Sequence, residues 1–249
     1  MRRLLERLAR RRSPALEAFD APLAPERPCA VIGDVHGRDD LLVRLAAELA
    51  ERAPDAQVVL VGDLIDRGER SAEVLRRVAE RGDWLCLRGN HEAMCLEFLD
   101  EPDRHGPRWL LNGGLQTLAS FGVGGLTERS RGGALLEARD RLQVAMGEAL
   151  IGWLRTRPLL WQSGNVVVTH AGADPGRSIE AQEEQVLLWG HPRFTEAPRQ
   201  DGLWVVHGHT ILPRPIMEDG RIAVDTGAYA TGRLTAALIG EGSLDFVST

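Results

Sequence analysis

Side chains that bind divalent metal ions follow several short apolar runs in this chain. The first run leads into AVIGDVHG, where Asp34 and His36 stand two residues apart. In an extended segment such residues point to the same side, so the pair could bind one metal ion where a strand ends. A single Asp-x-His pair is weak evidence, because a capped turn explains it equally well. The construction recurs, however, with Asp63, Asn90, His170, and one or both of His207 and His209.

This mixed set of carboxylates, imidazoles and one carboxamide suits Mn²⁺, Fe²⁺ or Zn²⁺, and it includes no thiolate. The ligands are too many for one tetrahedral ion and about right for two. If one carboxylate bridges them, two ions about 3.5 to 4 Å apart can hold a hydroxide and bind both the attacking and the leaving oxygen of a phosphoryl group. The residues therefore predict two-metal phosphoryl hydrolysis, in which the protein chiefly supplies position and charge.

Alternating strands and helices are predicted to position the first of these residues. Strands are expected from Cys29, at 57–62 and at 84–87, and helices at 38–52 and 71–81, with Ser71 as the second helix's N-cap. This β-α-β-α-β order favours parallel strands joined by crossover helices. In such a sheet the ligand site lies at the carboxyl ends of the strands, where all three polar motifs occur.

The remainder of the chain changes pattern twice. Residues 93–158 are mainly helical, and we interpret them as a helical insertion that forms a lid or a substrate wall; no role is assigned to its WLLNGG segment at 109–114. Strands are then predicted at 165–170 and 203–209, and a closing antiparallel set at 221–225 and 234–239.

Composition restricts the class of protein. The chain has 249 residues, 43% of them hydrophobic, a net charge of −6 and no lysine, so a nucleic-acid partner is not expected. Three cysteines without a C-x-x-C pair indicate neither a disulfide framework nor a thiolate zinc site. Neither a transmembrane run nor the apolar core of a signal peptide is visible, and a cytoplasmic location is expected.

Residues 1–28 are predicted to be an N-terminal arm and a proline-rich linker that precede a single catalytic domain, 29–249. The arm opens with MRRLLERLARRR, which places three leucines on one helical face among six arginines. The first interpretation is a solvated helix, or an arm that docks on the domain. The alternative is weak attachment to an anionic membrane surface or to an acidic partner.

Six motifs in order, spread over most of the chain, carry a family resemblance: GDVHG at 33–37, GDLIDRG at 62–68, RGNHE at 88–92, THAG at 169–172, HGHT at 207–210 and DTGA at 225–228. Together they resemble the calcineurin-like metallophosphoesterases, and more narrowly the serine/threonine phosphoprotein phosphatases of the compact bacterial and phage type. The resemblance implies an α/β fold, a β-sandwich of two mixed sheets flanked by helices.

The resemblance also implies the metal ligands. Asp34 and His36 would bind the first ion, Asp63 would bridge, and the second ion would be bound by Asn90, His170 and His209. Spacing alone does not choose between His207 and His209, which would share one face of the predicted strand; the family places the ligand at His209. Two divalent ions are expected, with Mn²⁺ first and Fe²⁺ or Zn²⁺ as alternatives.

The implied catalytic roles fall on the DRG and RGNHE motifs. His91 would protonate the leaving alkoxide, Asp66 would orient and charge that imidazole, and Arg67, assisted by Arg88, would bind the phosphate. The alternative is structural, since an Asp in a turn often caps and a His can satisfy backbone groups. Tyr229, the only tyrosine, would line the site or lie in the core or at the rim.

One departure from the family concerns a second phosphate-binding arginine after the LLW motif. Here the chain reads LLWGHPRF, with His191 at that place and Arg193 two residues later. Either Arg193 takes over the contact, or His191 binds phosphate weakly, or the alignment slips. We predict that Arg193→Ala impairs phosphate binding more than His191→Ala.

The expected function is hydrolysis of phosphoserine and phosphothreonine, with phosphotyrosine as an additional substrate, in phosphoproteins or phosphopeptides by direct attack of the metal-bridging hydroxide. The alternative is a symmetrical diadenosine tetraphosphate hydrolase. That branch usually reads GNHD and lacks the second Asp of DLIDRG, which favours the phosphatase. A non-catalytic phosphate-binding or scaffold protein would be expected to have lost a ligand or the acid, and none is missing.

Overall fold

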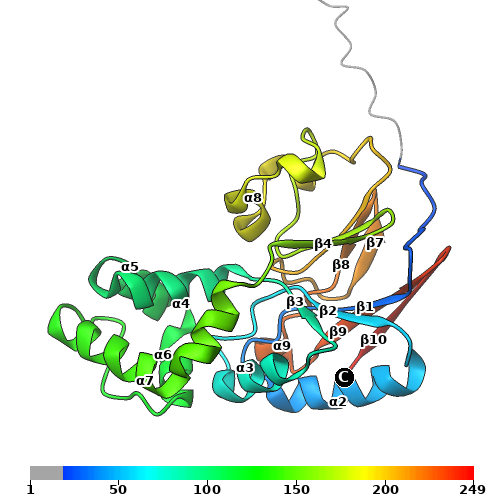
Figure 1. Ribbon diagram of the computed structural model, residues 1–249. Coiled ribbons are helices and arrows are strands. Elements are labelled where there is room, and N and C mark those ends of the chain that lie inside the picture. The colour runs from blue at the N-terminus through cyan, green and yellow to red at the C-terminus, as the bar shows by residue number, and fades with distance from the viewer. Residues whose placement is uncertain (1–18) are drawn as a thin grey trace, which may run out of the picture.

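The computed structural model describes residues 19–249, which form two five-stranded sheets flanked by helices (Figure 1). The predictions for the arginine-rich arm therefore lie outside the described residues. The first sheet has the order β10-β9-β1-β2-β3 and the second β4-β5-β6-β8-β7. The strands are β1 (Cys29–Ile32), β2 (Gln57–Leu60), β3 (Leu85–Cys86), β4 (Leu160–Ser163), β5 (Val166–Thr169), β6 (Trp204–His207), β7 (Ile216–Glu218), β8 (Arg221–Ala223), β9 (Thr235–Gly240) and β10 (Ser243–Ser248).

Both sheets are mixed, as predicted. In the first sheet β1 pairs in parallel with β2, and β2 with β3, while β9 runs antiparallel to β1 and to β10. In the second sheet β5, β6 and β8 are parallel, and β4 and β7 are antiparallel edges. The prediction that 221–225 and 234–239 close one antiparallel set is wrong, because β8 and β9 belong to different sheets. The strands β4, β7 and β10 were not predicted.

Alternate side chains of the central strands enter different cores. Val31 and Val59 face the second sheet, where Val166, Val168 and Val206 meet them, so the space between the sheets is an apolar core. Their strand neighbours Ile32 and Leu60 face the helices on the other side. Both faces are thus buried, which explains why these strands read as continuous apolar runs.

The helices are α2 (Asp39–Arg52), α3 (Ser71–Glu80), α4 (Asn90–Asp100), α5 (Pro102–Trp109), α6 (Leu115–Ser120), α7 (Gly133–Arg155), α8 (Glu184–Trp189) and α9 (Ala228–Thr231). In Figure 1, α2 and α3 lie under the first sheet, and α4 to α7 form a separate group beside it, within the predicted helical insertion. None of the helices among residues 19–249 combines the length and the apolar character needed to cross a membrane.

The predicted cap of α3 is wrong. Ser71 is the first residue of the helix, after Arg70 at the N-cap position, and the Ser71 hydroxyl does not cap it. That hydroxyl instead accepts a hydrogen bond from the backbone N–H of Asp66, at 3.1 Å. Ser71 therefore supports the DRG loop that precedes α3.

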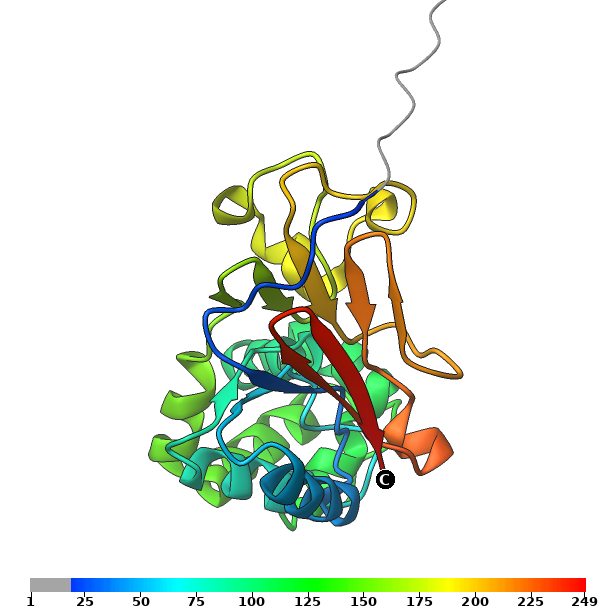
Figure 2. The same ribbon diagram turned by 90° about the vertical axis from the view of Figure 1, so that its right-hand side faces the viewer.

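Residues 19–28 pack on the folded domain although they contain no helix or strand (Figure 2). The ring of Phe19 lies edge-on to Trp204, 4.7 Å between centroids, and Leu23 is buried. Asn165 accepts a hydrogen bond from the backbone N–H of Ala24 and donates one to the carbonyl of Pro22, both 2.8 Å. The domain boundary at Cys29 stays a prediction, but this part of the predicted linker is attached to the second sheet.

Candidate metal centre and active site

The candidate metal ligands and catalytic residues follow the carboxyl ends of the parallel strands, as this architecture predicts. Most of them lie in the connecting loops, whereas Asn90 and His91 are the first two residues of α4. Six non-glycine residues within 19–249 have positive φ, and five of these are candidate site residues: His36, Asp63, Asp66, Arg67 and His209. Left-handed backbone is unfavourable for side chains with a Cβ and persists where the surroundings enforce it. The strands therefore end before the ligands, and tight turns aim the side chains.

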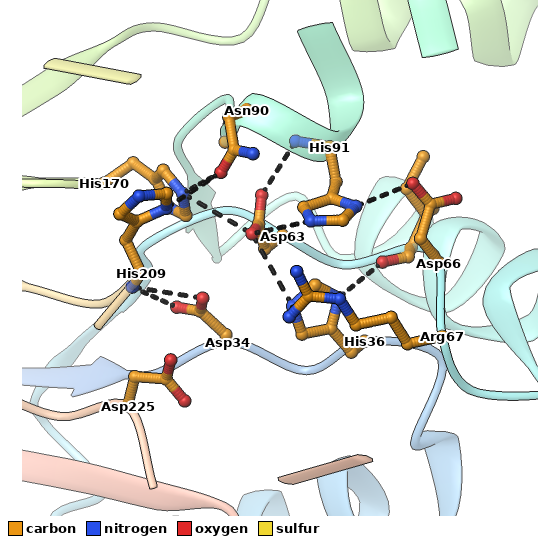
Figure 3. Close-up of polar contacts among 12 residues, drawn as sticks. Asp34, His36, Asp63, Asp66, Arg67, Asn90, His91, His170, His209 and Asp225 are labelled. Carbon is orange, nitrogen blue, oxygen red and sulfur yellow. Dashed lines mark hydrogen bonds and ion pairs between the residues drawn. The ribbon is translucent and has the colours of Figure 1, made fainter. Parts of the chain in front are cut away.

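Two groups of potential ligands meet at one carboxylate. His36 and His91 with Asp63 form one group, and His170 and His209 with Asp63 form the other, with donor atoms within 4.8 Å of one another in each. The Oδ2 atom of Asp63 lies 3.6 Å from His36 Nε2 and 3.5 Å from His170 Nε2 (Figure 3). A carboxylate shared by two groups has the position that a bridging ligand between two ions requires.

The carboxamide of Asn90 joins the second group. Its Oδ1 atom lies 2.7 Å from His170 Nε2 and 3.0 Å from His209 Nδ1. Asn90 is the first residue of α4, which begins directly after the loop that follows β3. The helix start thus places a carboxamide oxygen beside two imidazoles that follow strands of the second sheet.

Two imidazoles have their ring nitrogens oriented by backbone carbonyls. The Nδ1 atom of His36 lies 2.7 Å from the carbonyl of Ile65, and that of His170 lies 3.1 Å from the carbonyl of Val61. A carbonyl only accepts, so Nδ1 carries the proton in both rings and the Nε2 lone pair faces Asp63. This is the tautomer that a metal ligand needs.

Burial favours the neutral forms of these groups. It raises the pKa of Asp63 well above the usual range, an effect that the neighbouring Glu92 increases, and it lowers the pKa of His36 and His170 well below theirs. Bound cations would stabilise the carboxylate and need neutral imidazoles. The donor set therefore fits two divalent ions.

Asp34 lies beside these groups rather than in them. Its carboxylate accepts hydrogen bonds from the backbone N–H of His209, at 3.2 and 3.1 Å, and burial together with the charge of Asp225 raises its pKa well above the usual range. The prediction that Asp34 and His36 share one face of an extended segment is wrong, because β1 ends at Ile32 and His36 has a φ of 46°.

His207 and His209 are separated by the end of β6. His207 is the last strand residue; it is buried against the ring of Phe194, 4.9 Å between centroids. His209 lies in the following turn, with a φ of 64°, and belongs to the second ligand group. The prediction that the two imidazoles share one face of a strand is therefore wrong, and only His209 lies among the potential ligands around Asp63.

His91 and Asp66 form a buried hydrogen-bonded pair. The Nδ1 atom of His91 lies 2.7 Å from Asp66 Oδ2, and its Nε2 atom faces Asp63 at 3.8 Å. Burial raises the pKa of Asp66 to about 7 and lowers that of His91 to about 3. One proton therefore lies in the hydrogen bond between the Asp66 carboxyl group and the His91 imidazole. A carboxylate, unlike the carbonyl behind His36, supports an imidazolium.

Glu92 organises the loop that carries Asp63, a role the sequence did not suggest. Its carboxylate accepts hydrogen bonds from the backbone N–H groups of Asp63 and Leu64, both 2.8 Å, of Ile65 at 3.3 Å and of Gly89 at 2.9 Å. It is fully buried, and burial raises its pKa to about 7. The final residue of RGNHE therefore joins the loops after β2 and β3.

The predicted phosphate-binding residues occupy different surroundings. The Arg67 guanidinium lies 3.2 Å from His36 Nε2 and 4.9 Å from the centre of the Tyr229 ring, at the edge of the first group. Tyr229 also packs edge-on to His36, so it lines the site. Arg88 instead donates to Glu184, the first residue of α8, at 2.7 Å.

Arg193 and His191 lie on the segment between β5 and β6. Arg193 is exposed, and its backbone N–H donates to His191 Nδ1 at 3.3 Å. The other nitrogen of His191 lies 3.8 Å from Asp174. Within residues 19–249 no hydrogen bond or ion pair joins the Arg193 guanidinium to the ligand groups. Its role in phosphate binding stays a prediction.

The fold and the two ligand groups define a class of metal-dependent phosphoester hydrolases. The family model described as calcineurin-like phosphoesterase matches residues 27–213. The chain therefore belongs to the calcineurin-like phosphoesterase family, which confirms the broader of the two predicted resemblances.

Individual relatives carry different names. The chain is 30% identical to an asymmetrical bis(5'-nucleosyl)-tetraphosphatase of Bacillus velezensis, over 82% of this chain and 86% of that protein. It is 28% identical to serine/threonine-protein phosphatase 2 of Salmonella typhimurium, over 82% and 89%. A symmetrical bis(5'-nucleosyl)-tetraphosphatase of Klebsiella pneumoniae is 33% identical over 62% of this chain but only 46% of its own length.

Solved structures confirm the predicted fold. A "putative diadenosine tetraphosphatase" superposes with a TM-score of 0.64 at 20% identity, covering 92% of this chain and 98% of its own. A serine/threonine phosphatase from Saccharomyces cerevisiae gives a TM-score of 0.57 at 17% identity, covering 90% and 80%. At these identities the likeness concerns the fold alone.

Proposed function

We propose that the protein is a metal-dependent phosphomonoesterase that hydrolyses phosphoserine and phosphothreonine in proteins, and phosphotyrosine as well. The observation that carries the proposal is the buried His91–Asp66 pair beside the shared carboxylate Asp63. An alkoxide is a strongly basic leaving group and needs a proton as the bond to phosphorus breaks. A nucleoside phosphate leaving an anhydride is far less basic, so a built proton donor suits an ester of an alcohol better.

Each protein group then has a task. Two divalent ions, Mn²⁺ in our proposal, would be held by Asp34, His36, Asp63, Asn90, His170 and His209 and would neutralise phosphoryl charge and lower the pKa of the attacking water. Arg67 binds the phosphoryl oxygens from the edge of the first group. The Nε2 atom of His91 donates a proton to the leaving oxygen, and Asp66 holds the opposite side of that ring.

Turnover with purified protein tests this proposal. We expect a phosphoserine peptide with Mn²⁺ to be hydrolysed at a kcat/KM at least about tenfold above that for diadenosine tetraphosphate. Chelation of the metal should abolish both reactions, and Mn²⁺ should restore them. A dominant cleavage of the dinucleotide would overturn the choice of substrate.

The second candidate function is hydrolysis of bis(5'-nucleosyl) tetraphosphates, which the names of several relatives favour. The products separate its two forms, because symmetrical cleavage of diadenosine tetraphosphate yields only ADP and asymmetrical cleavage yields ATP and AMP. Chromatography of the same reaction mixtures measures this directly.

A further inference from the structure

The segment WLLNGG, residues 109–114, belongs to the group of helices α4 to α7, but it lies against the loop between β2 and α3 that carries Asp66 and Arg67. It ends in a kinked turn, Leu110–Gly114, between α5 and α6, in which Gly113 departs from helical backbone geometry. Its partners are Asp66 and Arg67, more than 40 residues earlier in the chain.

Gly113 permits the backbone of Arg67 to approach. It has a φ of 106°, and its carbonyl accepts a hydrogen bond from the Arg67 N–H at 3.3 Å. A Cβ atom at this position would lie 2.7 Å from the Arg67 nitrogen and 2.9 Å from the Arg67 Cγ atom. Any other residue would therefore displace Arg67, whose own φ is 69°.

Gly114 permits Trp109 to reach Asp66. A Cβ atom on Gly114 would lie 2.5 Å from the indole ring, which is fully buried. The indole Nε1–H donates to Asp66 Oδ2 at 2.8 Å. One turn further, the Thr117 hydroxyl donates to Asp66 Oδ1 at 2.5 Å and accepts from the Asp66 N–H at 2.9 Å.

We propose that WLLNGG and Thr117 are positioning elements for the reaction, and that they divide into two functions. Trp109 and Thr117 hold the carboxylate of Asp66 in the orientation that meets His91, and Gly113 holds Arg67 where it binds phosphate. The proposal rests on the proposed function, in which His91 is the proton donor and Arg67 the phosphate ligand. It predicts two separate kinetic effects, one on the dependence of kcat on the leaving group and one on phosphate affinity. A general loss of packing would change both together.

The first effect is a dependence on the leaving group. Phenyl phosphate releases a more basic oxygen than p-nitrophenyl phosphate and so depends more on protonation. In Trp109→Phe and Thr117→Val we expect kcat for phenyl phosphate to fall by about tenfold more than kcat for p-nitrophenyl phosphate. Thr117→Ser, which keeps the hydroxyl, should restore the wild-type ratio.

Phe98→Leu is the matched control for packing. The Phe98 ring packs on Trp109, 4.8 Å between centroids, and is fully buried. It makes no hydrogen bond to Asp66, because its side chain has no polar atom. This variant should lower the melting temperature as Trp109→Phe does, while the ratio of the two kcat values stays at the wild-type value.

The second effect is on phosphate affinity. We expect Gly113→Ala to raise the inhibition constant of inorganic phosphate about tenfold, with the leaving-group ratio unchanged. Gly122→Ala is the control, because Gly122 also has a positive φ, 76°, but no atom lies within 4 Å of a Cβ built there. It carries backbone strain without touching Arg67.

The outcomes separate this proposal from the proposed function. Equal losses on both aryl phosphates in Trp109→Phe and Thr117→Val, or a loss that Thr117→Ser does not restore, would overturn the role of Trp109 and Thr117. An unchanged phosphate inhibition constant in Gly113→Ala would overturn the role of Gly113. Failure of the wild-type protein to hydrolyse a phosphoserine peptide would instead count against the proposed substrate, since both aryl phosphates report on the site whichever natural substrate it accepts.

Discussion

The two sides of the site are held in place very differently. On one side, which we call the catalytic side, the loop after β2 bears Asp66 and the first turn of α4 bears His91 and Glu92, all at most 1% exposed. The other, the β5–β6 side, is the segment 171–201. It contains exposed charges such as Glu184 and Arg193, and pairs such as Arg177–Glu183 whose side chains are 50% and 61% exposed.

This difference suggests different tasks for the two sides, one in the reaction and the other in substrate selectivity. A buried carboxylate that accepts several hydrogen bonds is held in one position, because any displacement would leave a buried polar group without a partner. Exposed ion pairs contribute about 0 to 1 kcal/mol and rearrange easily. We infer that the catalytic side performs the reaction and that the β5–β6 side adapts to the substrate. Relatives with different substrate names on one fold are consistent with such a division.

Asp63→Asn should have the largest effect. Asp63 is the only carboxylate that both ligand groups share within the described residues. An asparagine at this position would offer one uncharged carbonyl oxygen in place of two carboxylate oxygens. We expect kcat to fall about a thousandfold with saturating Mn²⁺. Asp174→Asn, on the β5–β6 side, should change kcat less than about threefold. Turnover in Asp63→Asn that recovers fully after metal restoration would refute the bridging role.

Glu92→Gln should destabilise the fold more than any comparable change on the β5–β6 side. An amide cannot accept four N–H groups as the carboxylate does, and its own NH₂ would face donors. We expect a loss of about 3 kcal/mol in the free energy of unfolding, measured with urea. Glu97→Gln on the same helix, where the side chain is 44% exposed, is the control and should cost less than about 0.5 kcal/mol. Equal losses in the two variants would contradict the role of Glu92.

These residues also show what a sequence can predict. Asp63 and His170 each follow an apolar run, which predicts a strand end before each of them. Their strands, β2 and β5, belong to different sheets, so their approach to 3.5 Å depends on how the two sheets pack and could not be read from the strand pattern alone. The two mixed sheets followed from the family motifs. The strands β4, β7 and β10 lie at sheet edges and bury fewer side chains, so they lack the continuous apolar runs of the central strands; β10, for example, alternates exposed with half-buried residues over its first four positions.

Other site residues left no signal. Glu92 binds backbone N–H groups, which every residue possesses, so no motif reveals its partners. Trp109 reaches Asp66 across 43 positions of the chain, through a turn that depends on two glycines. The choice between His207 and His209 required the exact end of β6, and element ends are the least predictable feature of a sequence.

Acid should destabilise the folded protein through His207, which packs against the β5–β6 side. This histidine packs on Phe194 of that side, and burial lowers its pKa from 6.5 to about 4. A depressed folded-state pKa means that the stability is fully present above pH 6.5 and is lost as pH falls toward 4. We expect protonation of His207 to lower the free energy of unfolding by about 2 kcal/mol between pH 8 and pH 5.

The variant His207→Gln isolates that contribution. It removes the titrating group, so the free energy of unfolding should depend less steeply on pH between 6.5 and 4. The reduction in slope should correspond to about one fewer proton taken up on unfolding. Urea unfolding at several pH values, with Mn²⁺ present throughout, measures the slope. An unchanged slope would show that protonation of His207 does not contribute to the pH dependence of unfolding.

The smallest predicted effect concerns phosphate contacts from the β5–β6 side. Arg193 and His191 are neighbours on one turn, but a guanidinium keeps its charge and binds phosphate through two N–H groups, whereas an imidazole is a weaker partner. Arg193→Ala should therefore raise the KM for p-nitrophenyl phosphate about threefold, and His191→Ala less than twofold, with kcat unchanged in both. The reverse ranking would make His191 the phosphate contact. Two unchanged KM values would leave phosphate binding entirely to the catalytic side and would sharpen the division between the two sides of the site.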